Sequence, residues 1–264
     1  MRLLVKIGGA LLEEPAGRAR LAHEVGRALG LQHQVVILHG GGNQMRALQK
    51  RLAIPDRYHQ GLRITDADTA DVALMVLGGS VNRLLVASLM SSGLRAVGLT
   101  GADGNLFFAR RMVLPDVDLG YVGEATAFDR ALVDTLLAEH YVPVVSSVAP
   151  LLPHDAGPRD RFYNINADLA AGPMAVALGC DAALFLTDVP GVLDEHQQLL
   201  PALTVAQAED LIRRGVIRGG MEPKVRAALG AASAGCPLVK VLSGDSEDPI
   251  LGGLDPGRGT RFLP

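Results

Sequence analysis

Aromatic residues and cysteine are scarce in this sequence. There is no tryptophan, and aromatic residues make up 4% of the 264 residues. So few aromatic rings argue against a base-stacking nucleic-acid surface and against an aromatic-rich protein interface. The two cysteines, Cys180 and Cys236, stand far apart and in no metal-ligand spacing. We expect both to pack as small apolar side chains, and we expect no structural metal site.

Blocks of like charge are also missing. The net charge of −3 is spread along the chain, which gives no electrostatic reason to expect DNA, RNA or an anionic membrane as partner. The first apolar run, Leu3–Val5, is too short for a signal peptide, and we expect no apolar stretch to reach membrane-spanning length. These absences favour a soluble, cytoplasmic protein.

Short apolar runs are what the sequence has instead. Each is followed by Gly, Ser, Thr or Asp, and none alternates apolar with polar residues. Continuous runs of this kind are typical of strands covered on both faces, as in a parallel sheet. The predicted strands are Leu3–Ile7, Val35–Leu38, Arg95–Leu99, Val142–Val145, Ala182–Leu186 and Pro237–Leu242.

Helix-length segments lie between these strands, at about 18–30, 43–53, 67–91, 128–140, 166–179, 204–214 and 221–235. Thr204, with Gln207 three positions later, forms a capping-box pattern at the start of one of them. We interpret the less regular stretch 102–126 as hairpins that project from the sheet. Because strands and helices alternate, the sequence predicts an α/β sandwich.

Glycine-rich turns follow the first two predicted strands. In such sheets ligands bind beyond the carboxyl ends of the strands, which is where Gly8-Gly9 and Gly40–Gly42 stand. Their backbone N–H groups can approach phosphate oxygens closely. Neither turn matches a P-loop or a dinucleotide-binding turn, and a tight turn explains a glycine pair as well as a ligand does.

Lysine is rare, since only four of the 25 basic residues are lysines. Two of the four, Lys6 and Lys224, adjoin glycine-rich turns. A compact ammonium on a flexible stem can follow a phosphoryl group as it moves. The alternative is that both are ordinary solvated lysines.

Two further charged residues are candidates for a site. Asp168 stands at the start of an alanine-rich helix that Asn166 could cap, and its carboxylate could hold the two lysines in place. Arg63 could pair bidentately with a substrate carboxylate. The alternative for Arg63 is a surface salt bridge, which would contribute little.

No residue stands out as a general base. The seven histidines are scattered, none forms a nucleophile motif, and we interpret His39, at a strand end, as a residue that stabilises a turn. A kinase acting on a hydroxyl benefits from such a base. A kinase acting on a carboxylate does not, because a carboxyl group with a pKa of ~4 is already ionised at neutral pH.

Together these motifs resemble the amino acid kinase family, and among its members those that phosphorylate the side-chain carboxylate of N-acetylglutamate in arginine biosynthesis. The resemblance runs nearly end to end. It is carried by Val5–Gly9, His39–Gly42, Gly61–Thr65, Asn164–Asp168, Leu186–Asp194 and Gly220–Val225.

The resemblance implies an open αβα sandwich on a mainly parallel sheet of about eight strands. It implies an amino-terminal lobe, residues 1–178, that binds the acyl amino acid and forms a homodimer through the helix at 67–91. A carboxy-terminal lobe, residues 179–264, would bind ATP, whose phosphates would carry the Mg²⁺, so that the protein itself supplies no metal site.

The resemblance also assigns roles by position. Lys6 and Lys224 would neutralise the transferring phosphoryl group, and Asp168 would orient both. The residues Gly41, Gly42, Arg63 and Asn164 would hold N-acetylglutamate. Backbone groups of Gly8, Gly9 and Gly42 would face the phosphates, and the nucleotide would be flanked by Thr187, Asp188, Val189, Pro190, Gly191, Val192, Val216, Ile217 and Arg218.

Some features depart from the family pattern or leave rivals open. Arg218-Gly219 stands where relatives often carry other polar residues, and the early first strand suggests a dimer that arginine does not inhibit. One rival is a sister kinase acting on another acid, such as carrier-bound aminoadipate, glutamate or aspartate. Another is a non-catalytic sensor of a nucleotide or an amino acid.

Overall fold

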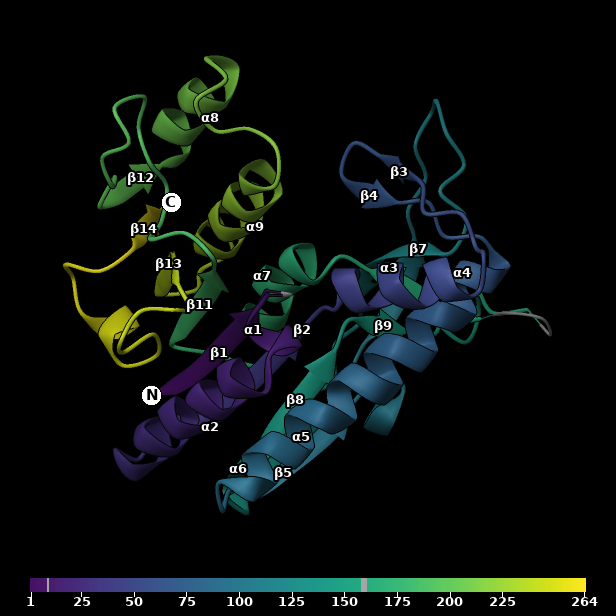
Figure 1. The fold of residues 1–264 in the computed structure, drawn as a ribbon, viewed down its shortest axis with the longest axis horizontal. Helices are drawn as coiled ribbons and strands as arrows, with labels where there is room; N and C mark the ends of the chain where they lie inside the picture. Colours follow the sequence, from purple (N-terminus) through teal and green to yellow (C-terminus); the bar gives the residue numbers. More distant parts are fainter. Residues whose placement is uncertain (9, 158–160) are drawn as a thin grey trace.

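The computed structural model describes residues 1–8, 10–157 and 161–264. Its centre is an eight-stranded sheet in which the pairs of neighbours are parallel except β13 with β14 (Figure 1). All six predicted strands are present in this sheet, and its two other strands, β12 and β14, were not predicted. In spatial order the strands are β12 (Ala202–Thr204), β14 (Thr260–Leu263), β13 (Leu238–Ser243), β11 (Ala182–Thr187), β1 (Arg2–Ile7), β2 (Gln34–His39), β8 (Val142–Ser146) and β5 (Ala96–Leu99).

Helices cover both faces of this sheet, because alternate residues of each central strand feed two separate cores. Leu3 and Val5 join one core and Leu4 the other. The predicted αβα sandwich is therefore confirmed. The first face carries α2 (Pro15–Gly30) and a long helix made of α4 (Ala67–Ala73), the π-helical η1 (Leu74–Val81) and α5 (Asn82–Ser91); the second carries α6 (Ala131–Ala138), α7 (Ala167–Ala177), α8 (Val205–Arg213) and α9 (Met221–Ser233).

The long helix contradicts the expectation that no apolar stretch reaches membrane-spanning length. Its 25 residues, Ala67–Ser91, are apolar and long enough to cross a membrane by length and composition alone. Half of its most apolar 18-residue stretch is buried inside the protein. Residues such as Leu85 and Leu89 belong to the first core and are fully buried. Packing against the sheet accounts for the apolar character of this helix.

Smaller elements lie at the carboxyl edge of the sheet. A four-stranded sheet has the order β6 (Phe108–Arg111), β7 (Val122–Thr126), β10 (Tyr163–Ile165) and β9 (Val148–Ala149). Its antiparallel β6–β7 pair confirms the predicted hairpin within 102–126. A hairpin of β3 (Tyr58–His59) and β4 (Leu62–Arg63), the short α1 (Ala10–Glu13) and α3 (Gly42–Arg51) complete this edge. The short 3₁₀ turns are Asp103–Asn105 and Gly252–Leu254.

Candidate active site

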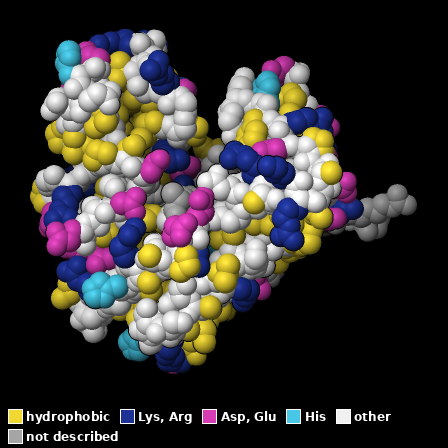
Figure 2. All heavy atoms as spheres, viewed as in Figure 1, with side chains coloured by type: hydrophobic (Ala, Val, Ile, Leu, Met, Phe, Trp, Pro, Cys, Tyr) yellow, Lys and Arg dark blue, Asp and Glu magenta, His cyan; other side chains and the backbone are white. Residues whose placement is uncertain are grey.

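A cavity of about 420 Å³ lies at the carboxyl ends of β1, β2 and β11. It opens between the part of the chain that carries α8 and α9 and the part that carries the β3–β4 hairpin, where the surface is hollowed (Figure 2). This is where an open α/β sheet binds its ligand, since the chain crosses to β11 on one side of β1 and to β2 on the other. The lining includes Lys6, Gly41, Arg63, Asn164, Asp168 and Lys224.

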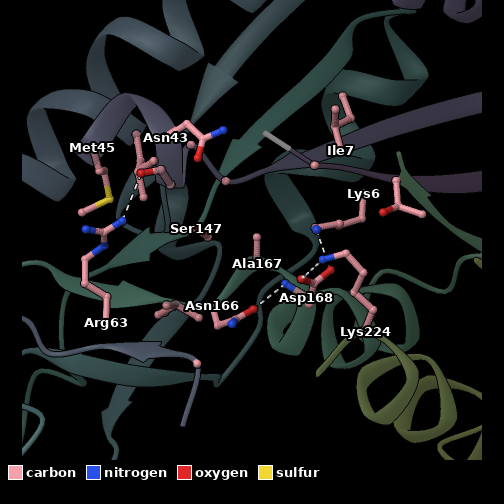
Figure 3. A pocket seen from close by; sticks show the side chains of 18 of the residues that line it. Lys6, Ile7, Asn43, Met45, Arg63, Ser147, Asn166, Ala167, Asp168 and Lys224 are labelled. Atoms are coloured by element: carbon pink, nitrogen blue, oxygen red, sulfur yellow. Dashed lines mark hydrogen bonds and ion pairs between the residues drawn. The ribbon is translucent and has the colours of Figure 1, made fainter. Parts of the chain in front are cut away.

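Two ammonium groups meet one carboxylate in this cavity. Lys6 Nζ lies 2.5 Å from Asp168 Oδ1, and Lys224 Nζ donates to Asp168 Oδ2 at 3.1 Å. Lys6 is 4% and Asp168 8% exposed, whereas the side chain of Lys224 is 21% exposed. Figure 3 shows the three side chains converging on one side of the pocket. One carboxylate thus contacts both ammonium groups, and the role of the three residues in catalysis stays a prediction.

Local structure places Asp168, and close helix packing brings Lys224 to it. The Asn166 side chain accepts hydrogen bonds from the backbone N–H of Asp168 at 2.8 Å and of Leu169 at 3.3 Å, which confirms the predicted cap of α7. Asp168 thus stands in the first turn, where the helix dipole favours a carboxylate. α7 also packs closely on α9 at Gly172. A Cβ at this position would lie 3.1 Å from the Cβ of Ala231, so glycine allows the close approach.

In the triad of Lys6, Asp168 and Lys224, burial disfavours the charged forms, whereas attraction between opposite charges favours them. Burial lowers the pKa of Lys6, and the nearby Lys224 ammonium adds to this, while Asp168 partly offsets both. Burial would raise the pKa of Asp168, but the two ammonium groups outweigh it and hold that pKa below its ordinary value. Asp168 is therefore ionised at neutral pH, and the site carries a surplus of positive charge that suits an anion.

Arg63 lies on the opposite side of the pocket (Figure 3). Its guanidinium donates to Gln49 Oε1 at 2.6 Å and to the Gly42 carbonyl at 3.0 Å, and it forms an ion pair with Asp56. It also stacks over the ring of Tyr58. With 7% exposure it is no surface salt bridge. Because the tertiary structure buries it, Arg63 is held firmly beside the cavity.

The glycine-rich turn between β2 and α3 forms a further wall of the cavity, with Asn164 beside it. A Cβ at Gly41 would lie 2.7 Å from Leu77 Cδ2, so a larger residue there would require the Leu77 side chain to move. α3 begins at Gly42, and the first N–H groups of a helix favour anions. Asn164 Nδ2 donates to Thr65 Oγ1 at 3.2 Å, which orients its amide.

The predicted nucleotide residues divide into two groups. Thr187 and Asp188 line the cavity, as does Gly8, whose own N–H already donates to the Leu186 carbonyl at 3.2 Å. Gly9 lies outside the described residues. The remaining predicted residues are not in the lining of this cavity: Val189, Pro190, Gly191, Val192, Val216, Ile217 and Arg218.

Sequence reasoning missed several residues that line the cavity. Asn43 directly follows the glycine-rich turn, and Ser147 stands two residues after the fourth predicted strand, so their position was a usable signal. Tyr58 reaches the site on a hairpin that left no pattern in the sequence. Other missed lining residues are Leu11, Met45, Leu77 and Asp245.

The sequence profile of the amino acid kinase family matches residues 1–242. The chain belongs to the amino acid kinase family. It is 40% identical to the acetylglutamate kinase of Brucella canis, over 99% of this chain and 90% of that protein. It is 39% identical, with the same coverage, to the acetylglutamate kinase of Brucella abortus strain S19.

Solved structures of this family share the fold. The smu.665 protein of Streptococcus mutans UA159 superposes with a TM-score of 0.83 at 26% identity, covering 99% of this chain and 98% of that one. N-acetylglutamate synthase from Neisseria gonorrhoeae, complexed with coenzyme A and N-acetyl-glutamate, superposes with a TM-score of 0.85 at 23% identity. This chain is covered completely and spans 59% of that one. The second likeness concerns the fold alone.

Proposed function

We propose that the protein transfers the γ-phosphoryl group of ATP to the side-chain carboxylate of N-acetyl-L-glutamate, giving an acyl phosphate and ADP in arginine biosynthesis. The observation that carries the proposal is the pair of lysines held on Asp168, facing a buried arginine across one cavity. Relatives that are 40% identical bear the name acetylglutamate kinase, which supports the choice of acid.

For this reaction the site must bring two anions together, the attacking carboxylate and the γ-phosphoryl group. The attacking carboxylate is already ionised at neutral pH, so no residue has to remove a proton. Lys6 and Lys224 would neutralise charge on the transferring phosphoryl group, and Asp168 would keep the two ammonium groups in place. Arg63, Asn164 and the glycine-rich turn, Gly41 with Gly42, would hold the acid in line with the γ-phosphorus.

Magnesium fits this site only together with the nucleotide. Asp168 is engaged by two lysines, and the described residues contain no cluster of three or more His, Cys, Asp or Glu that could hold a metal ion. Mg²⁺ bound to ATP would add positive charge at the phosphates. The protein's part is to supply ammonium groups and backbone donors around them.

Each substrate would occupy its own lobe. Residues 1–178 would bind the acid, since Arg63 and Asn164 lie there, and residues 179–264 would bind ATP. The predicted nucleotide residues Thr187–Val192 and Val216–Arg218 follow β11 and α8 in this second part. Transfer would then take place at the carboxyl end of β1, where Lys6 stands between the two.

A substrate panel tests the proposal. The enzyme is incubated with MgATP and one acid at a time, with hydroxylamine present to trap any acyl phosphate as a hydroxamate. We expect hydroxamate and ADP in equal amounts with N-acetylglutamate. Turnover only with glutamate, aspartate or carrier-bound aminoadipate would assign the protein to a sister kinase, and ATP binding without turnover on any acid would make it a sensor.

The protein would work as a homodimer in the cytoplasm. The long helix exposes large apolar side chains, with Met75 53%, Leu84 54% and Met90 60% exposed. Several large apolar side chains exposed on one helix are consistent with a surface that a partner covers.

Charges placed at these exposed positions should separate the subunits. Leu84→Glu together with Met90→Glu is expected to halve the mass measured by light scattering, because each carboxylate would have to be buried without a partner. Leu31→Glu is the matched control, since Leu31 is 63% exposed at the end of α2. A double variant that keeps the mass of the unmodified protein would remove this helix from the interface.

A further inference from the structure

A buried histidine–asparagine pair lies directly behind the glycine-rich turn. His39, the last residue of β2, and Asn82, the first of α5, are both fully buried. His39 Nδ1 lies 2.8 Å from the Gly40 carbonyl oxygen, and its Nε2 lies 3.0 Å from Asn82 Nδ2. The same Asn82 amide donates to the Val144 carbonyl at 2.9 Å. The pair therefore ties the long helix to the ends of two strands.

These contacts fix the protonation state of the ring. A carbonyl oxygen can only accept, so Nδ1 carries the proton and Nε2 accepts from the Asn82 amide. Burial, helped by the nearby Arg83 guanidinium and opposed by the bond to Gly40, lowers the pKa of His39 to about 4. The ring is neutral at physiological pH, and its contact with the Gly40 carbonyl agrees with the interpretation of His39 as a turn-stabilising residue.

The long helix is shaped to make this contact. Its π-helical segment, Leu74–Val81, ends directly before Asn82, and such segments are often found at functional sites. Leu77 and Val81 pack on Gly41. In β5, Gly98 leaves room for the Asn82 amide, whose oxygen accepts from Arg83 Nη2 at 2.7 Å. Leu77 and Val81 of the π-helical segment therefore contact the glycine-rich turn, and Asn82, directly after them, contacts His39 at the end of β2.

The Gly40–Gly41 peptide carries the effect into the cavity. A trans peptide is planar, with its C=O and N–H pointing in opposite directions, and the described chain has no cis peptide. Holding the Gly40 carbonyl against His39 therefore aims the Gly41 N–H away from the ring. Gly40, Gly41 and Gly42 all line the cavity.

We propose that His39 and Asn82 are positioning residues for phosphoryl transfer: the Asn82 amide fixes the neutral His39 ring, and the ring fixes the peptide that presents Gly41 and Gly42 to the acid. The proposal rests on the proposed function. A purely structural role would cost stability but would leave the kinetic constants of the folded enzyme unchanged, and the two readings are separated by kinetics and by the state of the ring.

The decisive variant is Asn82→Asp, which keeps the shape but replaces the amide donor by an acceptor. We expect ¹⁵N-histidine spectra of the unmodified protein to show one ring that stays neutral, protonated at Nδ1, between pH 8 and pH 5. In Asn82→Asp this ring should become protonated near pH 6, because the carboxylate accepts from Nε2–H. We expect kcat/KM for N-acetylglutamate to fall by about 10²-fold at pH 8, to recover partly at pH 6, and KM for ATP to change little.

Two further variants distinguish loss of these specific hydrogen bonds from a general effect of substitution. His39→Asn keeps an amide that can donate to Gly40 and should lose less activity than His39→Leu. Ser80→Ala is the control on the same helix, where it removes only an exposed hydroxyl bonded to the Val76 carbonyl, and it should behave as the unmodified protein.

The outcomes for this proposal and for the proposed function are distinct. Folded Asn82→Asp protein with unchanged kcat/KM, or a loss as large in Ser80→Ala, would overturn the positioning role. A ring protonated at Nε2 in the unmodified protein would overturn it as well, and this spectrum needs no substrate. Failure of the unmodified enzyme to phosphorylate N-acetylglutamate would overturn the proposed function.

Discussion

Replacing Lys224 or Lys6 by alanine is expected to lower kcat by about 10²–10³-fold, the usual cost of losing one preorganised charge contact in a transition state. Both ammonium groups are held on Asp168 before substrate arrives. Little reorganisation is then needed when charge moves from one anion to the other. The loss should fall on kcat, because a contact that strengthens only during transfer contributes little to ground-state binding.

Lys224→Ala is the cleaner of the two variants, since Lys224 is partly exposed on α9, whereas Lys6 is buried in the central strand. Steady-state kinetics with ATP and N-acetylglutamate measure the effect, and thermal unfolding checks the fold. Lys50→Ala, at an exposed position of α3, is the matched control. A folded Lys224→Ala enzyme with near-normal turnover would remove this lysine from the mechanism.

Asp168→Ala is expected to lower the free energy of unfolding by about 3–5 kcal/mol at pH 7, because it leaves buried cationic groups without a partner. The pKa of Asp168 is lowered in the folded protein. Its contribution is therefore present above the ordinary aspartate pKa of ~3.9 and is lost as the pH falls through the folded value. Urea unfolding at pH 7 and at lower pH should show the difference between variant and unmodified protein shrinking in acid.

Activity should fall in the same variant, since two mutually repelling ammonium groups would no longer be held together. Glu124→Gln is the control, because Glu124 pairs with Arg110 at the surface, outside the cavity lining, with the two side chains 46% and 67% exposed. Such surface pairs typically contribute ~0–1 kcal/mol. Equal stability losses in the two variants would contradict the role given to the buried triad.

Local signals in the sequence predicted the elements well. Continuous apolar runs predicted six strands of the central sheet, because a strand covered on both faces needs no polar alternation. The capping box at Thr204 and Gln207 and the cap at Asn166 are both present, since a cap depends on residues within one turn. The short β12 and β14 were not predicted, because neither contains a continuous apolar run and both are specified by the strands that they pair with.

The site could be assembled only in part. Resemblance to a family pointed to Lys6, Asp168 and Lys224, and their ion pairs are present. No sequence pattern indicated that Arg63 would be buried, or that Tyr58 would line the same cavity from a short hairpin. These facts depend on how a hairpin folds over the edge of the sheet.

The sequence by itself determined which segments form most of the central strands and the helices, and which turns could receive phosphate, because both depend on residues close together in the chain. Tertiary structure alone decided that Gly172 would let α7 and α9 approach until Lys224 reached Asp168. It also decided that Asn82 would meet His39 across 43 positions. Contacts between distant residues are made by packing, and packing is a property of the whole fold.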